Sequence, residues 1–470
     1  MRLSFTGVLC LFVLNSFSQT ITQKIEKAYS LMENDPQLKY GITSLTVLNA
    51  QTGEVLFSRN SNVGLAPAST LKTVTSATAF HLLGPDYTWK TTFGYSGSIS
   101  ANGTLNGDLI LTGGGDPTLG SWRYAETKTE VLIRQWVQAV RESGIKEIKG
   151  RLIADDTLFG SQSLPAGWIW QDIGNYYGAG PNGLTWKENQ FDIYLKPGSK
   201  VGEPAILTRT DPAVPYLKIV NEVKTGPAGS GDNVYAYSAP YSNLIYLRGT
   251  YATDLKKVIA ASLPDPAFEL AFQLQDSLKK SGVQFSRAAI TGRQLNADKE
   301  SFLPVQKVLA VHTSPTLSEV VYWFNQKSIN LYGEHLLKTL AIQQGKEPET
   351  AEGVKEVQSF WKTRLGIEEG ALNVVDGSGL SPGDRITTMT MARILLSVKK
   401  EPWFKSYFDS FPVFNNMKMK SGSINDVIAY AGYQTGSSGT PFVFSIIINN
   451  YNGSSASVRQ KMFRVLDILK

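Results

Sequence analysis

Apolar and polar positions near the two ends of the chain form matching patterns. Close to the N-terminus, apolar residues recur at helical spacing over 20–32, which predicts an amphipathic helix. Two β-like runs follow at 41–49 and 54–58, joined by a turn at Gln51-Thr52-Gly53. This end of the chain therefore predicts one helix and a pair of strands.

The C-terminal end repeats that set in the opposite order. Two apolar runs at 427–434 and 441–450 flank a Gly-Ser-Ser-Gly turn, and an amphipathic helical pattern runs from 454 to the end. One antiparallel sheet assembled from both ends of the chain, with helices packed on it, would bury all of these apolar faces. The predicted fold class is therefore α/β, of the α+β type.

The middle of the chain has a different pattern of predicted elements. Between about 90 and 310, short β-like runs alternate with Gly/Pro-rich turns, and only two helical patterns occur, at about 126–143 and 266–281. The β-like runs lie at 109–112, 150–154, 191–195 and 243–247. We expect a β-rich insertion of two subdomains, one nested in the other. The predicted division is a signal peptide at 1–18, one domain split between 19–89 and 312–470, and the insertion at 90–311.

The N-terminal stretch predicts export. Arg2 precedes an apolar run over 7–14, which is too short to span a bilayer, and small residues follow at 16–18. The one cysteine, Cys10, lies inside this stretch, so the exported chain has no disulfide and no thiolate metal site. We expect location in the periplasm or cell envelope, and neither a metal nor an organic cofactor.

The net charge and its distribution along the chain indicate which classes of partner the protein can bind. The formal net charge is +6, and acidic and basic residues are mixed along the chain without a dense Lys/Arg run. This surplus mildly favours anionic surfaces, including peripheral contact with a membrane, but it is not typical of nucleic-acid binding.

The stretch Ala66-Pro67-Ala68-Ser69-Thr70-Leu71-Lys72 opens a helical pattern that runs to Phe80. Three residues make almost one turn, so Ser69 and Lys72 share a helix face. A serine hydroxyl needs an adjacent base to become a nucleophile, and a lysine shielded from water can lose its proton and act as that base. Ser-x-x-Lys also occurs, without this context, at Ser143/Lys146, Ser277/Lys280, Ser359/Lys362 and Ser397/Lys400.

A second element, Ser328-Ile329-Asn330, lies between helical patterns at 315–324 and 331–344. Ser328 and Asn330 can face one cleft, where a hydroxyl relays a proton and an amide holds a peptide. The alternative is that Ser328 is simply a helix N-cap.

The third element is Lys420-Ser421-Gly422-Ser423, on a predicted strand that precedes the C-terminal pair. Gly422 allows a ligand to approach the backbone closely, and Ser423 can donate its N–H to an oxyanion. A competing Lys224-Thr225-Gly226 is followed by Pro227, which has no N–H to donate.

Together, Ser69-x-x-Lys72, Ser328-x-Asn330 and Lys420-Ser421-Gly422 resemble the motifs of the penicillin-recognising serine DD-peptidases. The long stretch between Ser69 and Ser328 resembles the low-molecular-mass D-alanyl-D-alanine carboxypeptidase/endopeptidases with large inserted domains. Three further stretches support this branch: Leu111-Thr112-Gly113-Gly114-Gly115-Asp116-Pro117, Gly167-Trp168-Ile169-Trp170-Gln171-Asp172 and Asp376-Gly377-Ser378-Gly379-Leu380-Ser381. The usual third motif is Lys-Thr-Gly, and Ser421 keeps the hydroxyl of that threonine.

The resemblance implies a role for each motif. Ser69 attacks the bond between two D-alanines of a peptidoglycan stem peptide, Lys72 takes its proton, and Ser328 returns a proton to the leaving amine. The other residues are implied to bind substrate. Asn330 binds the peptide backbone, Lys420 and Ser421 bind the terminal carboxylate, and Asp172 and Arg385 bind the peptide stem. The backbone N–H groups of Ser69 and Ser423 stabilise the oxyanion, and Gly422 lets the ligand approach the backbone closely. β-Lactam antibiotics are the implied inhibitors.

The residues argue against three alternatives to a serine DD-peptidase. Gly379-Leu380-Ser381-Pro382-Gly383 has the spacing of an esterase elbow, but Pro382 lacks the N–H that the oxyanion needs. A β-lactamase has no use for so large an insertion and needs a clear deacylating base. A wall-binding module with a decayed site would not keep every polar residue named above.

Overall fold

The fold is that of a computed structural model that describes residues 20–470. The predicted signal peptide, with Arg2 and Cys10, lies outside the described residues. No helix among residues 20–470 is long and apolar enough to cross a membrane. The same residues contain no group of three or more His, Cys, Asp or Glu side chains that could hold a metal ion.

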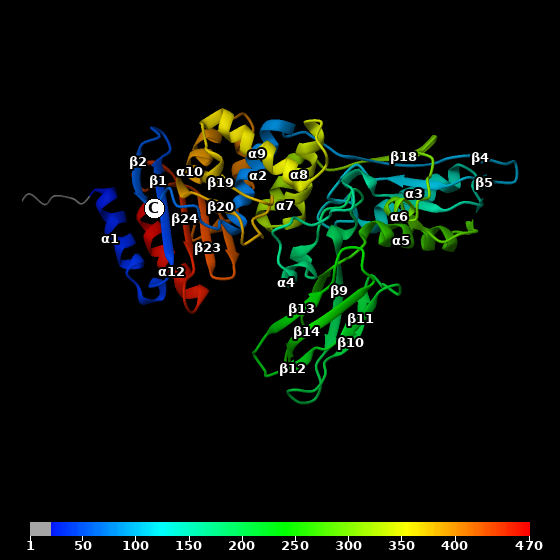
Figure 1. The fold of residues 1–470 in the computed structure, drawn as a ribbon, viewed down its shortest axis with the longest axis horizontal. Helices are drawn as coiled ribbons and strands as arrows, with labels where there is room; N and C mark the ends of the chain where they lie inside the picture. The colour runs from blue at the N-terminus through cyan, green and yellow to red at the C-terminus, as the bar shows by residue number, and fades with distance from the viewer. Residues whose placement is uncertain (1–19) are drawn as a thin grey trace, which may run out of the picture.

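A six-stranded antiparallel sheet combines the two ends of the chain (Figure 1). Its strands, in spatial order, are β2 (Val55–Arg59), β1 (Ile42–Asn49), β24 (Pro441–Asn449), β23 (Val427–Thr435), β22 (Met417–Ile424) and β21 (Val413–Phe414). β1 pairs with β24 along its whole length, from Ile42 opposite Asn449 to Asn49 opposite Phe442. The single sheet predicted from the two ends is therefore confirmed.

Helices cover both faces of this sheet. The outer face packs against α1 (Ile21–Glu33) and α12 (Ser455–Leu466), where Leu45, Val47 and Ile446 lie in one apolar core. The inner face packs against a larger helical layer around α2 (Lys72–Leu83). The other members of that layer are α7 (Leu317–Gln326), α8 (Asn330–Gln343), α9 (Thr350–Leu365), α10 (Thr388–Ser397) and α11 (Phe404–Asp409).

The first part of the middle region is built on a second sheet, with the order β17-β8-β6-β3-β18. These strands are β17 (Ile290–Thr291), β8 (Leu152–Asp155), β6 (Leu109–Thr112), β3 (Lys90–Tyr95) and β18 (Lys307–Thr313). A smaller sheet, β16 (Gln284–Phe285), β7 (Glu147–Ile148), β5 (Thr104–Asn106) and β4 (Ser98–Ile99), extends this part outward. Helices α3 (Thr129–Glu142), α5 (Pro266–Lys280) and α6 (Gly292–Ala297) lie with them (Figure 1).

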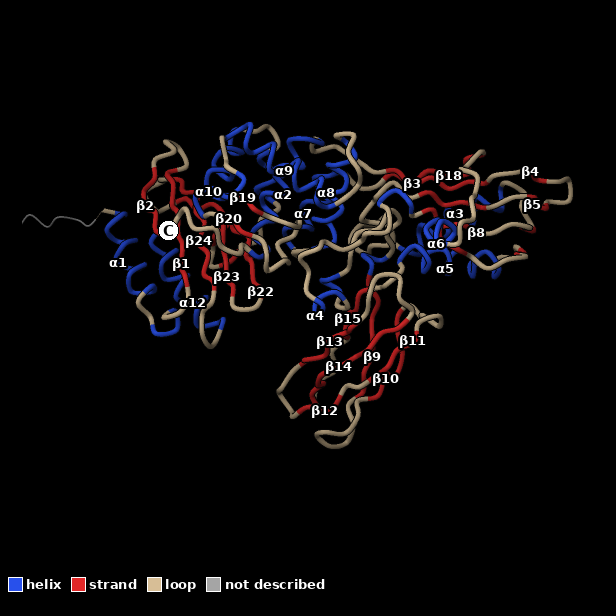
Figure 2. The backbone as a smooth tube through the Cα atoms, viewed as in Figure 1, coloured by secondary structure: helices blue, strands red, loops and turns tan. Residues whose placement is uncertain are grey.

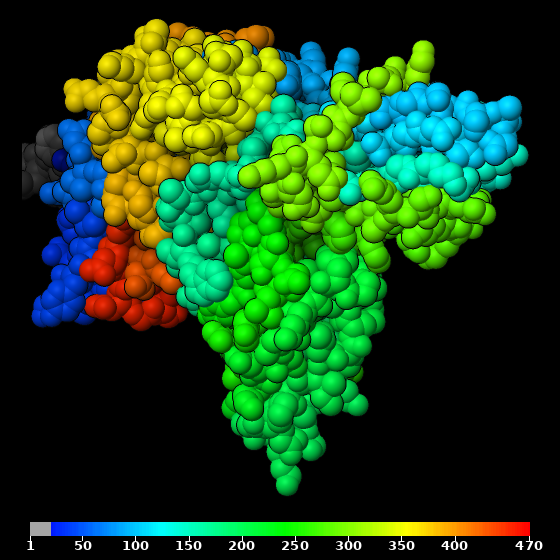
Figure 3. Space-filling view, turned by 45° about the vertical axis from the view of Figure 1, so that its right-hand side comes forward, coloured from blue at the N-terminus to red at the C-terminus, as the bar shows by residue number. Residues whose placement is uncertain are grey.

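A second lobe projects from this part, as Figures 2 and 3 show. Its two sheets share one apolar core. One sheet contains β10 (Ile206–Asp211), β9 (Gln190–Lys196) and β15 (Ile259–Ser262). The other contains β11 (Lys218–Asn221), β12 (Lys224–Gly226), β13 (Asp232–Tyr237) and β14 (Leu244–Ala252). A short helix, α4 (Trp170–Ile173), packs against β13 of this lobe (Figure 1).

The predicted nucleophile helix differs from expectation at its start. Ala68–Leu71 form a 3₁₀ turn, and the α-helix itself begins at Lys72. The reason is local: Ala68 has φ of 45°, in the left-handed region that is unfavourable for a residue with a side chain. The chain therefore enters the helix through a sharp bend that ends at Ser69.

Candidate active site

Ser69 and Lys72 are brought together by the bend before α2. Lys72 Nζ lies 2.9 Å from Ser69 Oγ, 2.6 Å from Asn330 Oδ1 and 2.6 Å from the carbonyl oxygen of Ser378. Asn330 is held in place because its Nδ2 donates to the carbonyl oxygen of Tyr177 at 2.7 Å. The first two predicted motifs thus meet at one amine.

The three contacts of Lys72 suit a base. A neutral amine has two N–H bonds and one lone pair, and Asn330 Oδ1 and the Ser378 carbonyl can only accept. These two oxygens take both N–H bonds, which leaves the lone pair for the hydroxyl hydrogen of Ser69. When Lys72 is charged, its third N–H donates to Ser69 Oγ instead, and the hydroxyl cannot be activated.

Burial favours the neutral form of this lysine. The Lys72 side chain is fully buried, and loss of water around the ammonium lowers its pKa to about 7. Negative charge on the nearby carboxyl groups acts in the opposite direction, Asp376 most strongly and Glu334 and Asp384 when they are ionised, and keeps the pKa of Lys72 from falling further. Lys72 therefore gains and loses its proton close to neutral pH.

The three carboxyl groups form a buried layer behind Lys72. Asp376 accepts hydrogen bonds from the backbone N–H groups of Ser378, Gly379 and Ser381, and from Trp168 Nε1. Glu334 accepts from Gly377 N, at 3.1 Å and 3.2 Å from its two oxygens. Burial raises the pKa of Glu334 and that of Asp384 well above their ordinary values, so these two groups resist ionisation. The layer fixes the loop whose Ser378 carbonyl binds Lys72.

Two glycines allow the backbone to pack closely around Ser69. A β-carbon at Gly379 would lie 1.9 Å from the carbonyl oxygen of Ala68, and one at Gly422 would lie 2.8 Å from the amide nitrogen of Ser69. Gly379 also has φ of 80°. Because only glycine fits at both places, the Asp376 loop and strand β22 can hold the bend before α2 from two sides.

The Ser328 and Lys420 motifs form a second serine–lysine pair. Lys420 Nζ donates to Ser328 Oγ at 3.0 Å and to the carbonyl oxygen of Ser421 at 2.8 Å. Lys420 is buried, and loss of water, followed by the charge of Lys72, lowers its pKa well below the ordinary value. Ser328 is not a helix N-cap: Ile329 occupies that position, and Ser328 has φ of 56°. Its strained backbone aims the hydroxyl at Lys420.

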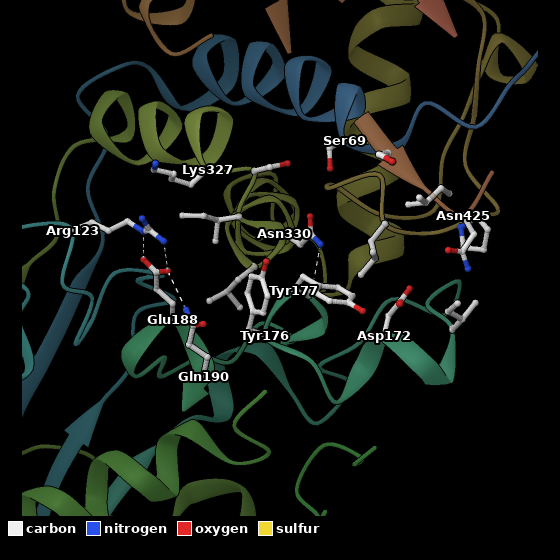
Figure 4. A pocket seen from close by; sticks show the side chains of 18 of the residues that line it. Ser69, Arg123, Asp172, Tyr176, Tyr177, Glu188, Gln190, Lys327, Asn330 and Asn425 are labelled. Carbon is white, nitrogen blue, oxygen red and sulfur yellow. Dashed lines mark hydrogen bonds and ion pairs between the residues drawn. The ribbon is translucent and has the colours of Figure 1, made fainter. Parts of the chain in front are cut away.

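A cavity of about 490 Å³ opens over these residues (Figure 4). Ser69, Ser328, Asn330 and Ser423 lie on its wall. Figure 4 shows Asp172 and Asn425 to one side of Ser69 and Lys327 with Arg123 to the other. The remaining lining residues come from the six-stranded domain and from the middle region: Trp122, Ile169, Tyr176, Tyr177, Glu188, Gln190, Ile329, Leu331, Leu380, Pro382 and Ile424.

The two predicted stem-binding residues lie in different settings. Asp172, in α4, lines the cavity, and partial burial raises the pKa of its carboxyl group. Arg385 is exposed and does not line the cavity; its Nη1 donates to the carbonyl oxygens of Pro382 and Asp384. The structure brings Asp172, but not Arg385, to the wall around Ser69.

Neither Ser381 nor any residue of the competing Lys224-Thr225-Gly226 lines this cavity. Ser381 of the esterase-like stretch is buried, and its hydroxyl donates to the Gly167 carbonyl oxygen at 3.0 Å. The competing Lys224-Thr225-Gly226 forms β12 in the projecting lobe, where it pairs with β14.

Some lining and supporting residues were not predicted. Glu334 follows Asn330 by four residues in α8, so its position one turn along the same face could have been found from the spacing. Arg123 and Glu188 form a buried ion pair in the cavity wall, with Nε 2.7 Å from Oε1. No local signal links these two residues, because they lie in separate loops of the middle region.

The fold is an antiparallel sheet with helices on both faces, and the site is a serine next to a buried lysine at the start of a central helix. Fold and site together define the class of penicillin-recognising serine hydrolases.

Comparison with known proteins identifies the branch. The sequence profile of the D-Ala-D-Ala carboxypeptidase 3 (S13) family matches residues 25–468, and the chain belongs to this family. It is 30% identical to a D-alanyl-D-alanine carboxypeptidase of Actinomadura sp., over 92% of this chain and 82% of that protein. It is 24% identical to the D-alanyl-D-alanine carboxypeptidase DacB of Haemophilus influenzae, over 88% of this chain and 86% of that protein.

A solved structure confirms the fold. The crystal structure of penicillin binding protein 4 (dacB) from Haemophilus influenzae matches with a TM-score of 0.76 and 22% identity, and the match covers 93% of this chain and 97% of that one. The same protein complexed with a β-lactam matches with a TM-score of 0.73. The predicted family, fold class and enzyme class are thus confirmed: the chain is a serine DD-peptidase.

Proposed function

We propose that Ser69 is the nucleophile and Lys72 its general base. The observation that carries this assignment is the fully buried Lys72 amine, 2.9 Å from Ser69 Oγ, with both of its N–H bonds directed to other oxygens. Ser69 Oγ bonds to the carbonyl carbon of the D-Ala-D-Ala bond while its proton passes to Lys72. The carbonyl oxygen becomes an oxyanion, which the backbone N–H groups of Ser69 and Ser423 stabilise by roughly 3 kcal/mol per donor.

Ser328 and Lys420 complete the acylation step. The C–N bond breaks, and the leaving amine takes a proton through Ser328, whose hydroxyl lies 3.0 Å from Lys420 Nζ. Water then hydrolyses the Ser69 ester, which releases the shortened peptide and restores the serine. A β-lactam follows the same first step, because its strained amide and carboxylate imitate the D-Ala-D-Ala terminus.

Lys420 and Ser421 are proposed to bind the terminal carboxylate of the substrate. Burial disfavours the charge on Lys420 in the free protein, and an entering carboxylate supplies the missing countercharge. Asn330 is proposed to bind the peptide backbone of the substrate through the same amide that positions Lys72.

The Asp172 side of the cavity is proposed to accept the acyl half of the substrate. Asp172 would bind an amino group on the stem side chain, as a carboxylate on the wall of a partly desolvated cavity can. Arg385 can share this task only if its guanidinium leaves the Pro382 and Asp384 carbonyl oxygens.

The cavity on the other side of Ser69 supports cleavage of cross-links as well. A carboxypeptidase releases a single alanine, yet the cavity extends from Ser69 to Arg123 and Lys327 (Figure 4), and Trp122 also lines it. Among residues 20–470, no hydrogen bond or ion pair engages the Lys327 ammonium, whereas Arg123 is paired with Glu188. This side suits a longer, anionic leaving peptide, so we propose endopeptidase activity in addition to carboxypeptidase activity.

The proposed peptidoglycan substrates support a location outside the cytoplasm. We propose export through the N-terminal stretch, action in the periplasm or cell envelope, and peripheral contact with the membrane.

Digestion of purified muropeptides tests these assignments. Wild-type protein should remove one D-alanine from pentapeptides and split cross-linked dimers, with products identified by mass. Lys327→Ala should lower kcat/KM for the dimer more than for the pentapeptide, whereas Ser69→Ala should abolish both reactions. Pentapeptide cleavage without dimer cleavage would contradict the endopeptidase assignment, and full activity of Ser69→Ala would contradict the nucleophile.

A further inference from the structure

One face of the projecting lobe carries an unusual row of aromatic side chains. In β13 and β14, residues alternate between the apolar core of the lobe and the outer surface. Tyr237 lies opposite Tyr246, and Tyr235 lies opposite Arg248, so these four residues are direct neighbours on the outer face. Their inward neighbours are core residues: Val234, Ala236, Ile245 and Leu247.

A cation lies among these rings. The guanidinium carbon of Arg248 is 5.5 Å from the ring centre of Tyr237 and 5.1 Å from that of Tyr246. Arg248 Nε also donates to Glu222 at 2.7 Å, and both of these side chains are about half exposed. The face therefore combines aromatic rings with charged groups that can donate and accept hydrogen bonds.

Trp170 connects this face to the active-site cavity. Its ring centre lies 6.1 Å from that of Tyr237, and its side chain is 55% exposed. Its chain neighbour Ile169 lines the cavity, as do Asp172 and Tyr176, and Tyr176 is 54% exposed. Aromatic side chains are therefore present on the cavity wall at Tyr176, in α4 at Trp170, and on the outer face of β13 and β14. Figure 1 shows α4 beside β13.

The chemistry of this surface fits a carbohydrate. A pyranose ring has an apolar C–H face that packs against an aromatic ring, and a rim of hydroxyl and acetamido groups that needs donors and acceptors. Tyr237, Tyr246 and Trp170 supply the rings; Arg248 and Glu222 supply the hydrogen-bonding groups. A protein partner would instead be expected to use a recessed apolar pocket at the centre of its footprint.

We propose that Trp170, Tyr237, Tyr246 and Arg248 form a binding surface for the glycan strand of polymeric peptidoglycan, and that this surface holds the polymer while a stem peptide enters the cavity. The inference rests on the proposed function, because that function defines a substrate in which stem peptides hang from a sugar strand. Holding the strand raises the effective concentration of stem peptides at Ser69 without altering the chemistry there.

The test separates glycan binding from peptide cleavage. Full-length protein, Trp170→Ala, Tyr237→Ala and the milder Arg248→Gln are each mixed with peptide-free glycan strands, and binding is measured by co-sedimentation. Tyr40→Ala is the matched control, because Tyr40 is 69% exposed and belongs to the turn before β1. The rate of β-lactam acylation checks that each variant is folded, and a free pentapeptide without sugar reports catalysis.

We expect wild type and Tyr40→Ala to bind the strands equally. Each aromatic substitution should weaken binding about two- to tenfold, taking the stacking energy of aromatic pairs as a guide. Cleavage of the free pentapeptide should stay within about twofold of wild type, while cleavage of intact polymer falls in step with binding.

Three results would overturn the inference: no binding of peptide-free strands by wild type, equal binding by wild type and by the folded variants, or an equal loss on polymer and on free peptide. A failure of the proposed function is a different result, since it would appear as absent acylation and absent peptide cleavage whether or not glycan binds.

Discussion

The protonation state of Lys72 should set the pH dependence of acylation. Burial lowers the pKa of Lys72 from 10.5 to about 7, so the lysine is half neutral near pH 7. With the ordinary pKa, only about one molecule in 3,000 would carry a neutral lysine at that pH. The fold therefore gains more than three orders of magnitude in the population of the reactive form.

The direction of the pH dependence follows from which protonation form of Lys72 reacts. Because the neutral amine accepts the Ser69 proton, the acylation rate should rise with pH, reach half of its plateau near pH 7, and fall about tenfold for each pH unit below that. At pH 5 about one hundredth of the plateau rate should remain. The second-order rate constant for acylation by a chromogenic β-lactam, measured by stopped flow from pH 5 to 9, gives this profile directly.

Two variants test whether the pH profile comes from Lys72. Lys72→Arg keeps a positive charge that cannot be removed in this range, so it should not be acylated at any of these pH values. Lys399→Gln is the control, because burial also lowers the pKa of Lys399 although it does not line the cavity around Ser69; its midpoint should equal that of wild type. A flat profile would refute the claim that burial sets the pKa of the base. So would a rate that still rises about tenfold per pH unit up to pH 9, with circular dichroism unchanged throughout.

Other predictions concern recognition, backbone packing and the middle region. Lys420→Ala should lower kcat/KM for a peptide that ends in a carboxylate by about ten- to a hundredfold, the value of a charge-assisted hydrogen bond, and should affect the amidated peptide much less; equal losses would assign Lys420 to the chemistry instead. Gly379→Ala should reduce acylation by at least tenfold, because its β-carbon would lie 1.9 Å from the Ala68 carbonyl oxygen. Gly229→Ala has a similar φ, 76°, but would meet nothing within 4 Å, so its acylation should be unchanged; similar losses in both variants would contradict the packing argument. Limited proteolysis within 90–311 should leave β-lactam binding largely intact if the insertion folds separately, whereas binding lost at the first cut would argue against a split catalytic domain.

The parts of the fold that could be predicted are those with strong local patterns. Periods of two and of 3.6 residues define β1, β24, α1 and α12, and the pairing of the two ends follows because each end alone exposes an apolar face. The strands of the projecting lobe and their pairing could not be predicted in the same way. Its strands between 206 and 237 are short and half exposed, and β11 and β12 pair in parallel with β14, a contact that no turn specifies.

In the candidate site, too, the features with a local sequence pattern could be predicted and the others could not. The three motifs could be found because each is a short stretch with its own chemistry. The competing Lys224-Thr225-Gly226 could be rejected because Pro227, which follows it, has no N–H to donate. The spacing from Asn330 indicates Glu334, but the rest of the carboxyl layer behind Lys72 could not be predicted, since Asp376 and Asp384 come from a loop that meets α8 only in the folded chain. The 3₁₀ bend at Ser69 also escaped prediction, because it depends on Gly379 and Gly422 packing from outside the segment.

The most direct test of the central claim is to locate the acyl bond. Labelled penicillin is incubated with the protein, the chain is digested, and the label is mapped by mass spectrometry, with Ser69→Ala as the control. The account predicts one label per molecule, on Ser69, and none in the variant. Label on Ser381 or on another Ser-x-x-Lys serine, or labelling that persists in Ser69→Ala, would contradict it.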